Sequence, residues 1–213
     1  MSAAGRVVVI AGATSGTGLA VTRALVGAGA HVIATGRSAA RLEPLQDAGA
    51  QVEVADATSL ESMRALAGRT GPVDGVIPLV GGWRGGGGLA GQSDEDFAAL
   101  LPALQAVRAT SRAFDEALRA SDAGRFAIVS STAVARPLAG GANYAAVKAA
   151  SEAWARSVAH GFAKAARDAE EELHAASVVF RAKQLDPNGL AAAVVGLWDR
   201  DAAELNDRVI ELS

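Results

Sequence analysis

Residues 7–18 read Val7-Val8-Val9-Ile10-Ala11-Gly12-Ala13-Thr14-Ser15-Gly16-Thr17-Gly18. The apolar run at their start predicts a short buried strand, and the apolar spacing that follows, over residues 18–28, predicts a helix. Glycines between a strand and a helix permit a tight turn, in which backbone amides and the positive end of the helix dipole can meet a phosphate group. The spacing G-x-x-x-G-x-G, with Thr14, Ser15 and Thr17 among the glycines, therefore predicts a nucleotide-binding turn. A plain strand-to-helix turn is the alternative.

The rest of the chain continues this alternation of short β-branched runs and longer helical stretches. We expect strands over residues 7–11, 31–35, 51–55, 74–80, 125–130, 176–181 and 208–212. We expect helices over residues 18–28, 41–49, 59–67, 94–120, 144–166 and 190–198. Strands that alternate with helices favour a parallel sheet covered on both faces. The length fits a single domain spanning residues 1–213.

Composition excludes several other classes of protein. The chain has no cysteine, which excludes disulfides and thiolate metal sites, and its three scattered histidines do not suggest a metal site. The net charge of −3 gives no attraction to nucleic acid or to an anionic membrane surface. No apolar run approaches the ~20 residues of a membrane span, and the first one is too short for a signal peptide. We therefore expect a soluble cytoplasmic protein without a metal.

The residues after the second and third strands bear on the choice of nucleotide. An NAD-selective site places an acidic residue after the second strand to bind the ribose 2′-hydroxyl, whereas this chain has Arg37 followed by Ser38. A guanidinium there suits a 2′-phosphate, which favours NADP(H), although a solvated arginine is the alternative. Asp56, followed by Ala57, is placed to meet an adenine edge. A capping role for Asp56 at the approach to the next helix is almost as plausible.

The only tyrosine of the chain, Tyr144, lies four residues before Lys148. On a helix these side chains share a face, one turn apart. A nearby ammonium favours the phenolate and lowers the tyrosine pKa, so that the phenol can exchange a proton with a carbonyl or alcohol oxygen. Alone, Tyr-x-x-x-Lys is a weak motif. Its weight comes from the nucleotide turn and from the Ser130-Ser131 pair upstream.

In this order, the glycine turn, Arg37, Ser131, Tyr144 and Lys148 resemble the short-chain dehydrogenase/reductase family over about residues 5–165. The resemblance implies a Rossmann-type, doubly wound parallel sheet of about seven strands in the order 3-2-1-4-5-6-7. It implies that Gly12, Gly16 and Gly18 are the cofactor glycines. It also implies that Tyr144 is the general acid, that Ser131 orients the carbonyl, and that Lys148 holds the nicotinamide ribose and lowers the tyrosine pKa.

The chain departs from the family pattern at three places. After the fourth strand it has Pro78-Leu79-Val80-Gly81 instead of Asn-Asn-Ala-Gly, so that only Gly81 and the backbone near Val80 can serve the cofactor. Residues 100–105 lack the asparagine that supports a proton-relay water, and Gln105 is a partial substitute. The sixth strand leads almost directly to one helix, without the usual substrate-binding insert.

A glycine-rich loop after the fourth strand could cover the site instead. Trp83 could stack on a ring and Arg84 could hold an acidic group, because ligands bind at this end of open α/β sheets. The alternative is that Trp83 packs at the edge of the domain and that Arg84 is solvated.

These features predict an NADP(H)-dependent oxidoreductase that interconverts a carbonyl and an alcohol on a small-molecule substrate, with no nucleic-acid or membrane partner. The alternative is an NADP-binding sensor or scaffold of the same fold without turnover. By resemblance, we expect a homodimer or homotetramer that pairs through the two long helices, around residues 96–120 and 144–164.

Overall fold

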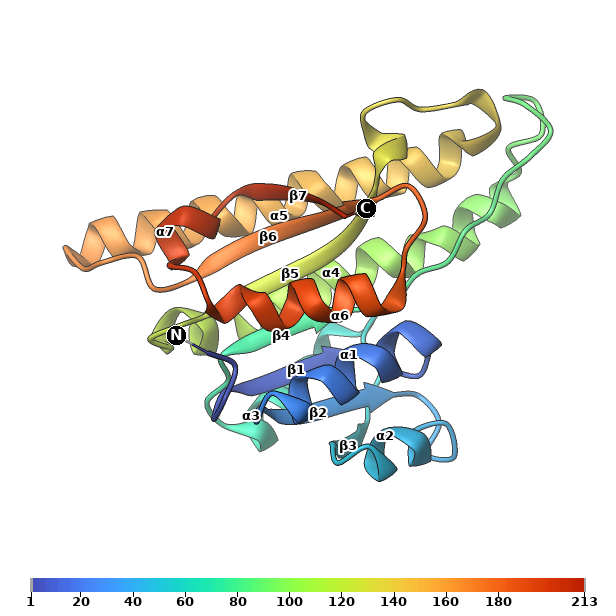
Figure 1. Ribbon diagram of the computed structural model, residues 1–213. Helices are drawn as coiled ribbons and strands as arrows, with labels where there is room; N and C mark the ends of the chain where they lie inside the picture. Colours follow the sequence, from blue (N-terminus) through green and yellow to red (C-terminus); the bar gives the residue numbers. More distant parts are fainter. Residues whose placement is uncertain (1, 213) are drawn as a thin grey trace.

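The computed structural model describes residues 2–212. Its seven strands form one parallel sheet in the order β3-β2-β1-β4-β5-β6-β7 (Figure 1). The strands are β1 (Val7–Ala11), β2 (His31–Gly36), β3 (Gln51–Val54), β4 (Gly75–Pro78), β5 (Arg125–Ser131), β6 (Ala176–Ala182) and β7 (Arg208–Leu212). The helices are α1 (Gly16–Gly27), α2 (Glu43–Asp47), α3 (Leu60–Thr70), α4 (Asp94–Ala120), α5 (Ala142–Ala169), α6 (Pro187–Val195) and α7 (Ala202–Leu205).

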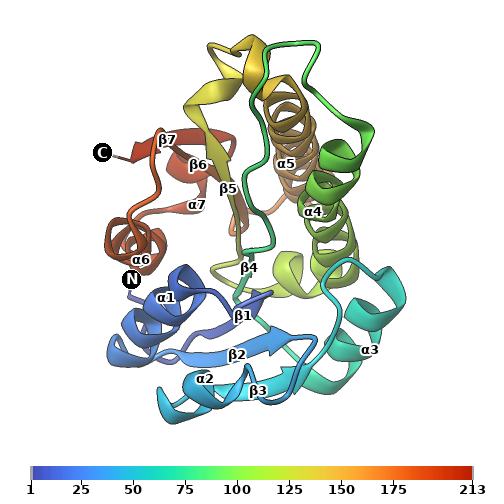
Figure 2. The ribbon, with the colours of Figure 1, turned by 90° about the vertical axis from the view of Figure 1, so that its right-hand side faces the viewer.

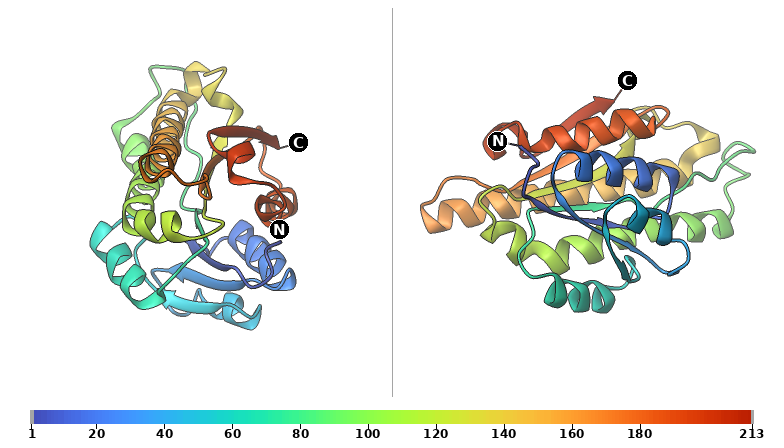
Figure 3. Two further views of the ribbon diagram at one scale, coloured as in Figure 1. Left: turned by 90° about the vertical axis from the view of Figure 1, so that its left-hand side faces the viewer. Right: turned by 60° about the horizontal axis from the view of Figure 1, so that its bottom comes forward.

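Helices cover both faces of the sheet (Figures 2 and 3). One face packs against α1, α2 and α6, and the other packs against α3, α4 and α5. Within β1, Val8 and Ile10 belong to the first core, whereas Val9 and Ala11 belong to the second, because successive strand residues point to opposite faces. A strand buried on both faces reads as a continuous apolar run, which explains the sequence of β1.

The expected fold class and strand order are confirmed, and the differences lie at the ends of elements. The strand predicted over residues 74–80 ends at Pro78, which cannot donate a hydrogen bond to the sheet. The helix predicted to begin at residue 18 begins at Gly16, because the side chain of Ser15 caps it.

The C-terminal helices differ most from the sequence pattern. The helix predicted over residues 190–198 begins at Pro187, where the Asp186 carboxylate accepts hydrogen bonds from the amides of Asn188 and Gly189. It ends at Val195 and continues as a single 3₁₀ turn. The short helix α7 was not expected, since one turn carries too little periodicity to predict. None of the helices that residues 2–212 form has the length and apolar character needed to cross a membrane.

Candidate active site

Two cavities open at the carboxyl ends of the central strands, where open α/β sheets bind ligands. The first, with a volume of about 420 Å³, lies beside the β1–α1 turn and the ends of β2 and β3, and is termed the nucleotide cavity. The second, of about 310 Å³, is lined by Tyr144 and Lys148 and is termed the Tyr144 cavity. Ser15, Val80 and Gly81 line both cavities, so the two adjoin.

Two glycines of the β1–α1 turn are required by close packing. Gly12 has a φ of +79°, and a Cβ there would lie 2.5 Å from Cγ2 of Val80. A Cβ on Gly18 would lie 2.0 Å from the carbonyl oxygen of Ala13. A larger residue at Gly18 would displace the backbone of the turn, and one at Gly12 would press on the Val80 side chain and strain a backbone with positive φ.

Gly16 has a different environment, because no atom lies within 4 Å of a Cβ added there. It begins α1, whose first turn is capped by a hydrogen bond of 3.1 Å from the Gly18 amide to Ser15 Oγ. The amino end of α1 therefore lies beside open space that a phosphate group can enter. Thr14 and Ser15 line the nucleotide cavity, and Thr17 lines the Tyr144 cavity.

The far end of the nucleotide cavity is basic. Arg37 and Ser38, which follow β2, line it as expected. Arg41 also lines it, and its Nη2 donates a 3.2 Å hydrogen bond to the carbonyl oxygen of Thr14. The sequence reasoning missed Arg41, although its position four residues after Arg37 was an available signal. Two guanidinium groups at one cavity suit a phosphate ester.

Asp56 and Ala57 line the same cavity, but the Asp56 carboxylate is already engaged. Its Oδ1 accepts hydrogen bonds from the amide and the hydroxyl of Thr58, at 2.9 and 2.8 Å. Asp56 thus forms a turn with Thr58 at the approach to α3, whereas the helix itself is capped by Ser59. Contact of Asp56 with an adenine stays a prediction.

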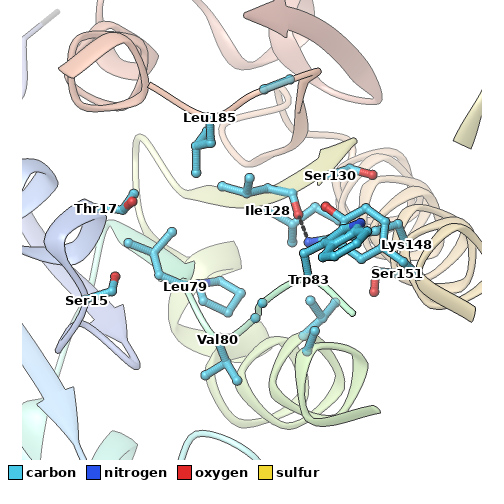
Figure 4. A pocket seen from close by; sticks show the side chains of 18 residues that line it. Ser15, Thr17, Leu79, Val80, Trp83, Ile128, Ser130, Lys148, Ser151 and Leu185 are labelled. Carbon is cyan, nitrogen blue, oxygen red and sulfur yellow. Dashed lines mark hydrogen bonds between the residues drawn. The ribbon is translucent and has the colours of Figure 1, made fainter. Parts of the chain in front are cut away.

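Tyr144 lies in the first turn of α5 and Lys148 one turn later (Figure 4 shows Lys148). Lys148 is only 8% exposed, and its Nζ donates a 2.8 Å hydrogen bond to the carbonyl oxygen of Val129 at the end of β5. The same Nζ lies 5.7 Å from the centre of the Tyr144 ring. The lysine is thus fixed by the strand rather than directed at the phenol oxygen.

The two adjacent serines have different partners. Ser130 forms part of the wall of the Tyr144 cavity, but its hydroxyl donates a 2.6 Å hydrogen bond to the buried carboxylate of Glu152. Ser131 is 7% exposed, and its Oγ accepts a hydrogen bond from the Ala133 amide. Hydrogen bonding of Ser131 with Tyr144 acts to lower the pKa of the phenol. Ser131 does not line the Tyr144 cavity itself, so its contact with a substrate oxygen stays a prediction.

The expected lowering of the Tyr144 pKa by Lys148 is wrong for this structure. Burial raises the pKa of Tyr144 above its usual value, and the Ser131 hydrogen bond offsets only part of this effect. Burial also lowers the pKa of Lys148 to about 8, with Glu152 acting in the opposite direction. Desolvation dominates both groups because the motif lies inside the cavity rather than on an exposed helix face.

The side of α4 that faces Lys148 is apolar. Ala103 and Val107 line the Tyr144 cavity there. Gln105 is exposed and lies on a separate surface depression with Arg108. The expectation that Gln105 substitutes for the family asparagine is therefore wrong, because helical geometry turns it away from the cavity.

The structure separates the two proposed substrate residues. Trp83 lines the Tyr144 cavity (Figure 4). Arg84 does not line it, and its Nε lies 3.8 Å from a carboxylate oxygen of Asp96. Leu185, in the short connection between β6 and α6, also lines the cavity and was missed, since a lone leucine in a loop gives no sequence signal.

A parallel sheet with a phosphate-accepting turn after β1 and two adjoining cavities at its carboxyl edge defines a dinucleotide-binding protein of the doubly wound class. The family model for the short chain dehydrogenases matches residues 6–166. The chain therefore belongs to this family of oxidoreductases, which use nicotinamide cofactors. No curated protein gives a significant match to the sequence.

Solved structures share the fold at low sequence identity. A short chain dehydrogenase/reductase family protein has a TM-score of 0.83 at 22% identity, with 100% of this chain and 97% of that chain covered. A short-chain type dehydrogenase/reductase from Mycobacterium ulcerans has a TM-score of 0.85 at 17% identity, with coverage of 99% and 89%. A gluconate 5-dehydrogenase from Burkholderia cenocepacia J2315, in complex with NADP and tartrate, has a TM-score of 0.81 at 19% identity, with coverage of 99% and 94%.

Proposed function

We propose that this chain is an NADP(H)-dependent oxidoreductase that interconverts a carbonyl and an alcohol. The observation that carries the proposal is the position of Tyr144 and Lys148 in a cavity that adjoins the nucleotide cavity through Ser15, Val80 and Gly81. Because the two cavities adjoin, a substrate carbonyl in the Tyr144 cavity could receive a proton from Tyr144 and a hydride from a bound nicotinamide.

The residues present fit a nicotinamide dinucleotide. The amino end of α1 lies beside open space at Gly16, which gives a pyrophosphate room to approach the helix amides. Val80 and Gly81 connect the two cavities, so a ligand that spans both would pass their backbone. When bound, the cofactor supplies or accepts the hydride at the carbonyl carbon.

Two arginines support NADP(H) over NAD(H). Arg37 and Arg41 line the nucleotide cavity, and no acidic residue follows β2 where a ribose 2′-hydroxyl would be bound. The guanidinium groups would hold a 2′-phosphate by charge-assisted hydrogen bonds.

The chain's own contribution is proton supply and orientation. Tyr144 would donate its phenolic proton to the substrate oxygen, and Ser131 would hydrogen-bond the same oxygen. Because its pKa is raised, mainly by burial, Tyr144 keeps its proton at neutral pH, which suits the acid role in carbonyl reduction. The Lys148 ammonium would bind the nicotinamide ribose.

Cofactor choice is tested by titrating NADPH and NADH into the wild type, Arg37→Ala and Arg41→Ala. We expect each substitution to weaken NADPH binding about 10- to 100-fold and to change NADH binding little, since only the 2′-phosphate loses a partner. Stronger binding of NADH than of NADPH by the wild type would overturn the assignment.

Catalysis is tested by following NADPH oxidation with a panel of carbonyl compounds. Tyr144→Phe should lower turnover about 10²- to 10⁴-fold while NADPH affinity stays within about threefold, because only the proton donor is lost. Equal turnover by the wild type and Tyr144→Phe would contradict the role given to Tyr144.

A sensor or scaffold without turnover is the second candidate. The apolar side chains of Ala103 and Val107, where the family has a relay asparagine nearby, favour it. Tight NADPH binding without Tyr144-dependent oxidation of NADPH on any carbonyl would support this candidate instead.

A further inference from the structure

The Tyr144 cavity has an unusual cover. Residues 183–186 alone separate β6 from α6, so no insert from that connection can close over the cavity. The long β4–α4 connection, residues 79–93, extends beyond the sheet beside the β5–α5 connection, residues 132–141 (Figures 1 and 2). Residues 81–93 are termed the cover loop.

The cover loop is tied to the β5–α5 connection by direct hydrogen bonds. The Gly86 amide donates to the Gly140 carbonyl oxygen at 2.7 Å, and Nε2 of Gln92 donates to the same oxygen at 3.1 Å. Oε1 of Gln92 accepts from the Asn143 amide at 3.1 Å, and the Asn143 side chain donates to the Ser93 carbonyl oxygen at 3.0 Å. Gln92 and Asn143, termed the Gln92–Asn143 latch, thus join the cover loop to the start of α5 although they lie 51 residues apart in sequence.

The glycines of the cover loop are needed for this conformation. Gly86, Gly87 and Gly88 have φ of +132°, +64° and +67°, a region that other residues rarely adopt. A Cβ on Gly85 would lie 2.5 Å from the Gly140 carbonyl oxygen. The glycine run therefore lets the loop lie close against Gly140.

The cover loop contributes one large side chain to the cavity. Trp83 lines it and is 62% exposed, so most of its ring is available to a ligand. Apart from Tyr144 and Lys148, the other large lining side chains are aliphatic: Leu79, Val80, Val107, Ile128 and Leu185. An indole at the mouth of an apolar cavity offers a flat surface on which another ring can stack.

Charge is nearly absent from the same walls. Among residues 2–212, Lys148 is the only charged residue that lines the Tyr144 cavity, and its Nζ is bonded to the Val129 carbonyl. Arg84, the nearest arginine in sequence to Trp83, pairs with Asp96. Lys148 keeps two further ammonium donors, but the proposed function assigns them to the nicotinamide ribose. A carboxylate or phosphate on the substrate would then lose its hydration without gaining a cationic partner.

We propose that the cover loop, held by the Gln92–Asn143 latch, is the substrate-binding element, and that Trp83 selects uncharged aromatic aldehydes and ketones. This inference rests on the proposed function. It assigns the substrate class to the stacking surface and the apolar walls, in place of an insert between β6 and α6.

The test compares three ketones with NADPH: acetophenone, 4-acetylbenzoate, which adds a carboxylate, and butanone, which lacks the ring. For the wild type we expect kcat/KM for acetophenone to exceed the other two values at least tenfold. Trp83→Ala should lower kcat/KM for acetophenone about 10- to 100-fold and for butanone less than threefold. Trp83→Phe should restore most of the loss. Phe97→Ala removes a partly exposed aromatic side chain outside the cavity and should change nothing.

Different results separate this inference from the proposed function. Tyr144-dependent reduction that prefers 4-acetylbenzoate or butanone, or that is unchanged in Trp83→Ala, would overturn the aromatic class and leave the reductase intact. If no ketone is reduced, the binding of acetophenone to the protein tests the aromatic site. Saturable quenching of tryptophan fluorescence by acetophenone, lost in Trp83→Phe, would support the binding site, and its absence would overturn it.

The latch has its own test. Gln92→Ala removes two hydrogen bonds between the cover loop and residues 140–143, so KM for acetophenone should rise at least fivefold, and more than KM for butanone. Equal effects on both substrates would show that the latch does not position Trp83.

Discussion

Lys148 carries an ammonium group although the residue is only 8% exposed. Burial lowers the pKa of Lys148 from 10.5 to about 8, and Glu152 acts in the opposite direction. Because the unfolded chain holds this proton more tightly, folding stability rises as the pH increases from about 8 to 10.5. The shift corresponds to about 3 kcal/mol that the charged lysine costs the folded chain at neutral pH. A substitution that removes the Lys148 ammonium would also remove its hydrogen bond to Val129, and this loss would offset about 1 kcal/mol of the gain in stability.

Lys148→Met should therefore raise the free energy of unfolding at pH 7 by about 2 kcal/mol while it removes the proposed ribose contact. The gain should disappear between pH 8 and pH 10.5, as the wild-type lysine becomes neutral. Urea denaturation at several pH values measures it, with Lys183→Met as the exposed control. A variant less stable than the wild type at pH 7 would refute the cost assigned to the buried charge.

Glu152 is 3% exposed and accepts hydrogen bonds from Arg181 at 2.8 and 2.6 Å and from Ser130 at 2.6 Å. Burial would raise its pKa, but the hydrogen bonds from Arg181 and Ser130 outweigh burial, and the pKa is lowered. Its stabilising contribution is thus present above the ordinary carboxyl pKa and is lost as the pH falls through the lowered value.

Glu152→Gln should lower the free energy of unfolding at pH 7 by about 3 kcal/mol, because Arg181 would keep a partly buried charge without its partner. The matched control is Glu211→Gln, which removes a 60% exposed carboxylate 3.7 Å from the same guanidinium and should cost less than about 1 kcal/mol. Thermal or urea unfolding of both variants decides. Similar losses for the two variants would count against a special role of the buried pair.

At this scale, sequence reasoning found the side chains but not their environment. The spacing of Tyr144 and Lys148 predicted their shared helix face, which the structure has. The direction of the tyrosine pKa could not be predicted, because it depends on burial, which raises the pKa, and on the hydrogen bond with Ser131, which offsets only part of this effect. Arg41 was missed for a similar reason, since its approach to Thr14 is set by the path of the chain after β2.

The β1–α1 turn contains two glycines with separable roles. A Cβ on Gly18 would lie 2.0 Å from the Ala13 carbonyl oxygen, whereas a Cβ on Gly16 meets no atom within 4 Å. Gly18→Ala should therefore lower the free energy of unfolding by about 2 kcal/mol or more, through displacement of the turn. Gly16→Ala should leave stability unchanged or slightly higher, since alanine favours the helix.

NADPH binding should be weakened by Gly16→Ala, the substitution that leaves stability unchanged. Gly16→Ala adds a methyl group where we expect the pyrophosphate to approach α1, so NADPH affinity should fall at least tenfold in a protein of normal stability. Gly27→Ala, a helical glycine at the other end of α1 that also meets no atom, is the control for helix propensity. Calorimetric titration beside thermal unfolding separates the two effects. Unchanged NADPH binding in Gly16→Ala would contradict the phosphate site.

Regular elements were predictable because each carries its own signal. The limits of α4 match the expectation, because its Ser93 cap, the acidic residues in its first turn and its apolar spacing all agree. The cover loop was predicted as a glycine-rich loop that could cover the site, but its path was not predicted. Its path depends on bonds between Gln92 and residues 140–143, which are distant in sequence and leave no local pattern.

At the scale of the molecule, the strand order followed from the family resemblance and from the alternation of strands and helices, which leaves few topologies open. The substrate could not be predicted in this way, because family members share the sheet and differ in the loops at its carboxyl edge. Its proposed class depends on where Trp83 and Leu185 lie in three dimensions.

The family resemblance predicts a homodimer or homotetramer that pairs through α4 and α5. The helices α4 and α5 run side by side on one face of the molecule (Figures 2 and 3). On the same face, Trp154 lines a surface hollow of about 400 Å³, and the Arg108 guanidinium lies 5.0 Å from the centre of its ring. Gly161 of α5 also lines the hollow, and a Cβ there meets no atom within 4 Å. Pairing of two copies through α4 and α5 stays a prediction, and this face is where it would take place.

Light scattering after size exclusion should give a mass of at least twice the 21.4 kDa of one chain. Gly161→Glu adds a charge to the predicted interface without a clash inside one chain. It should therefore shift the protein to the monomer, and the monomer should remain folded. Gly68→Glu, at an exposed glycine of α3 that also meets no atom, should leave the mass unchanged. A monomeric wild type would exclude the assembly, and an oligomer that both variants leave intact would move its interface away from α4 and α5.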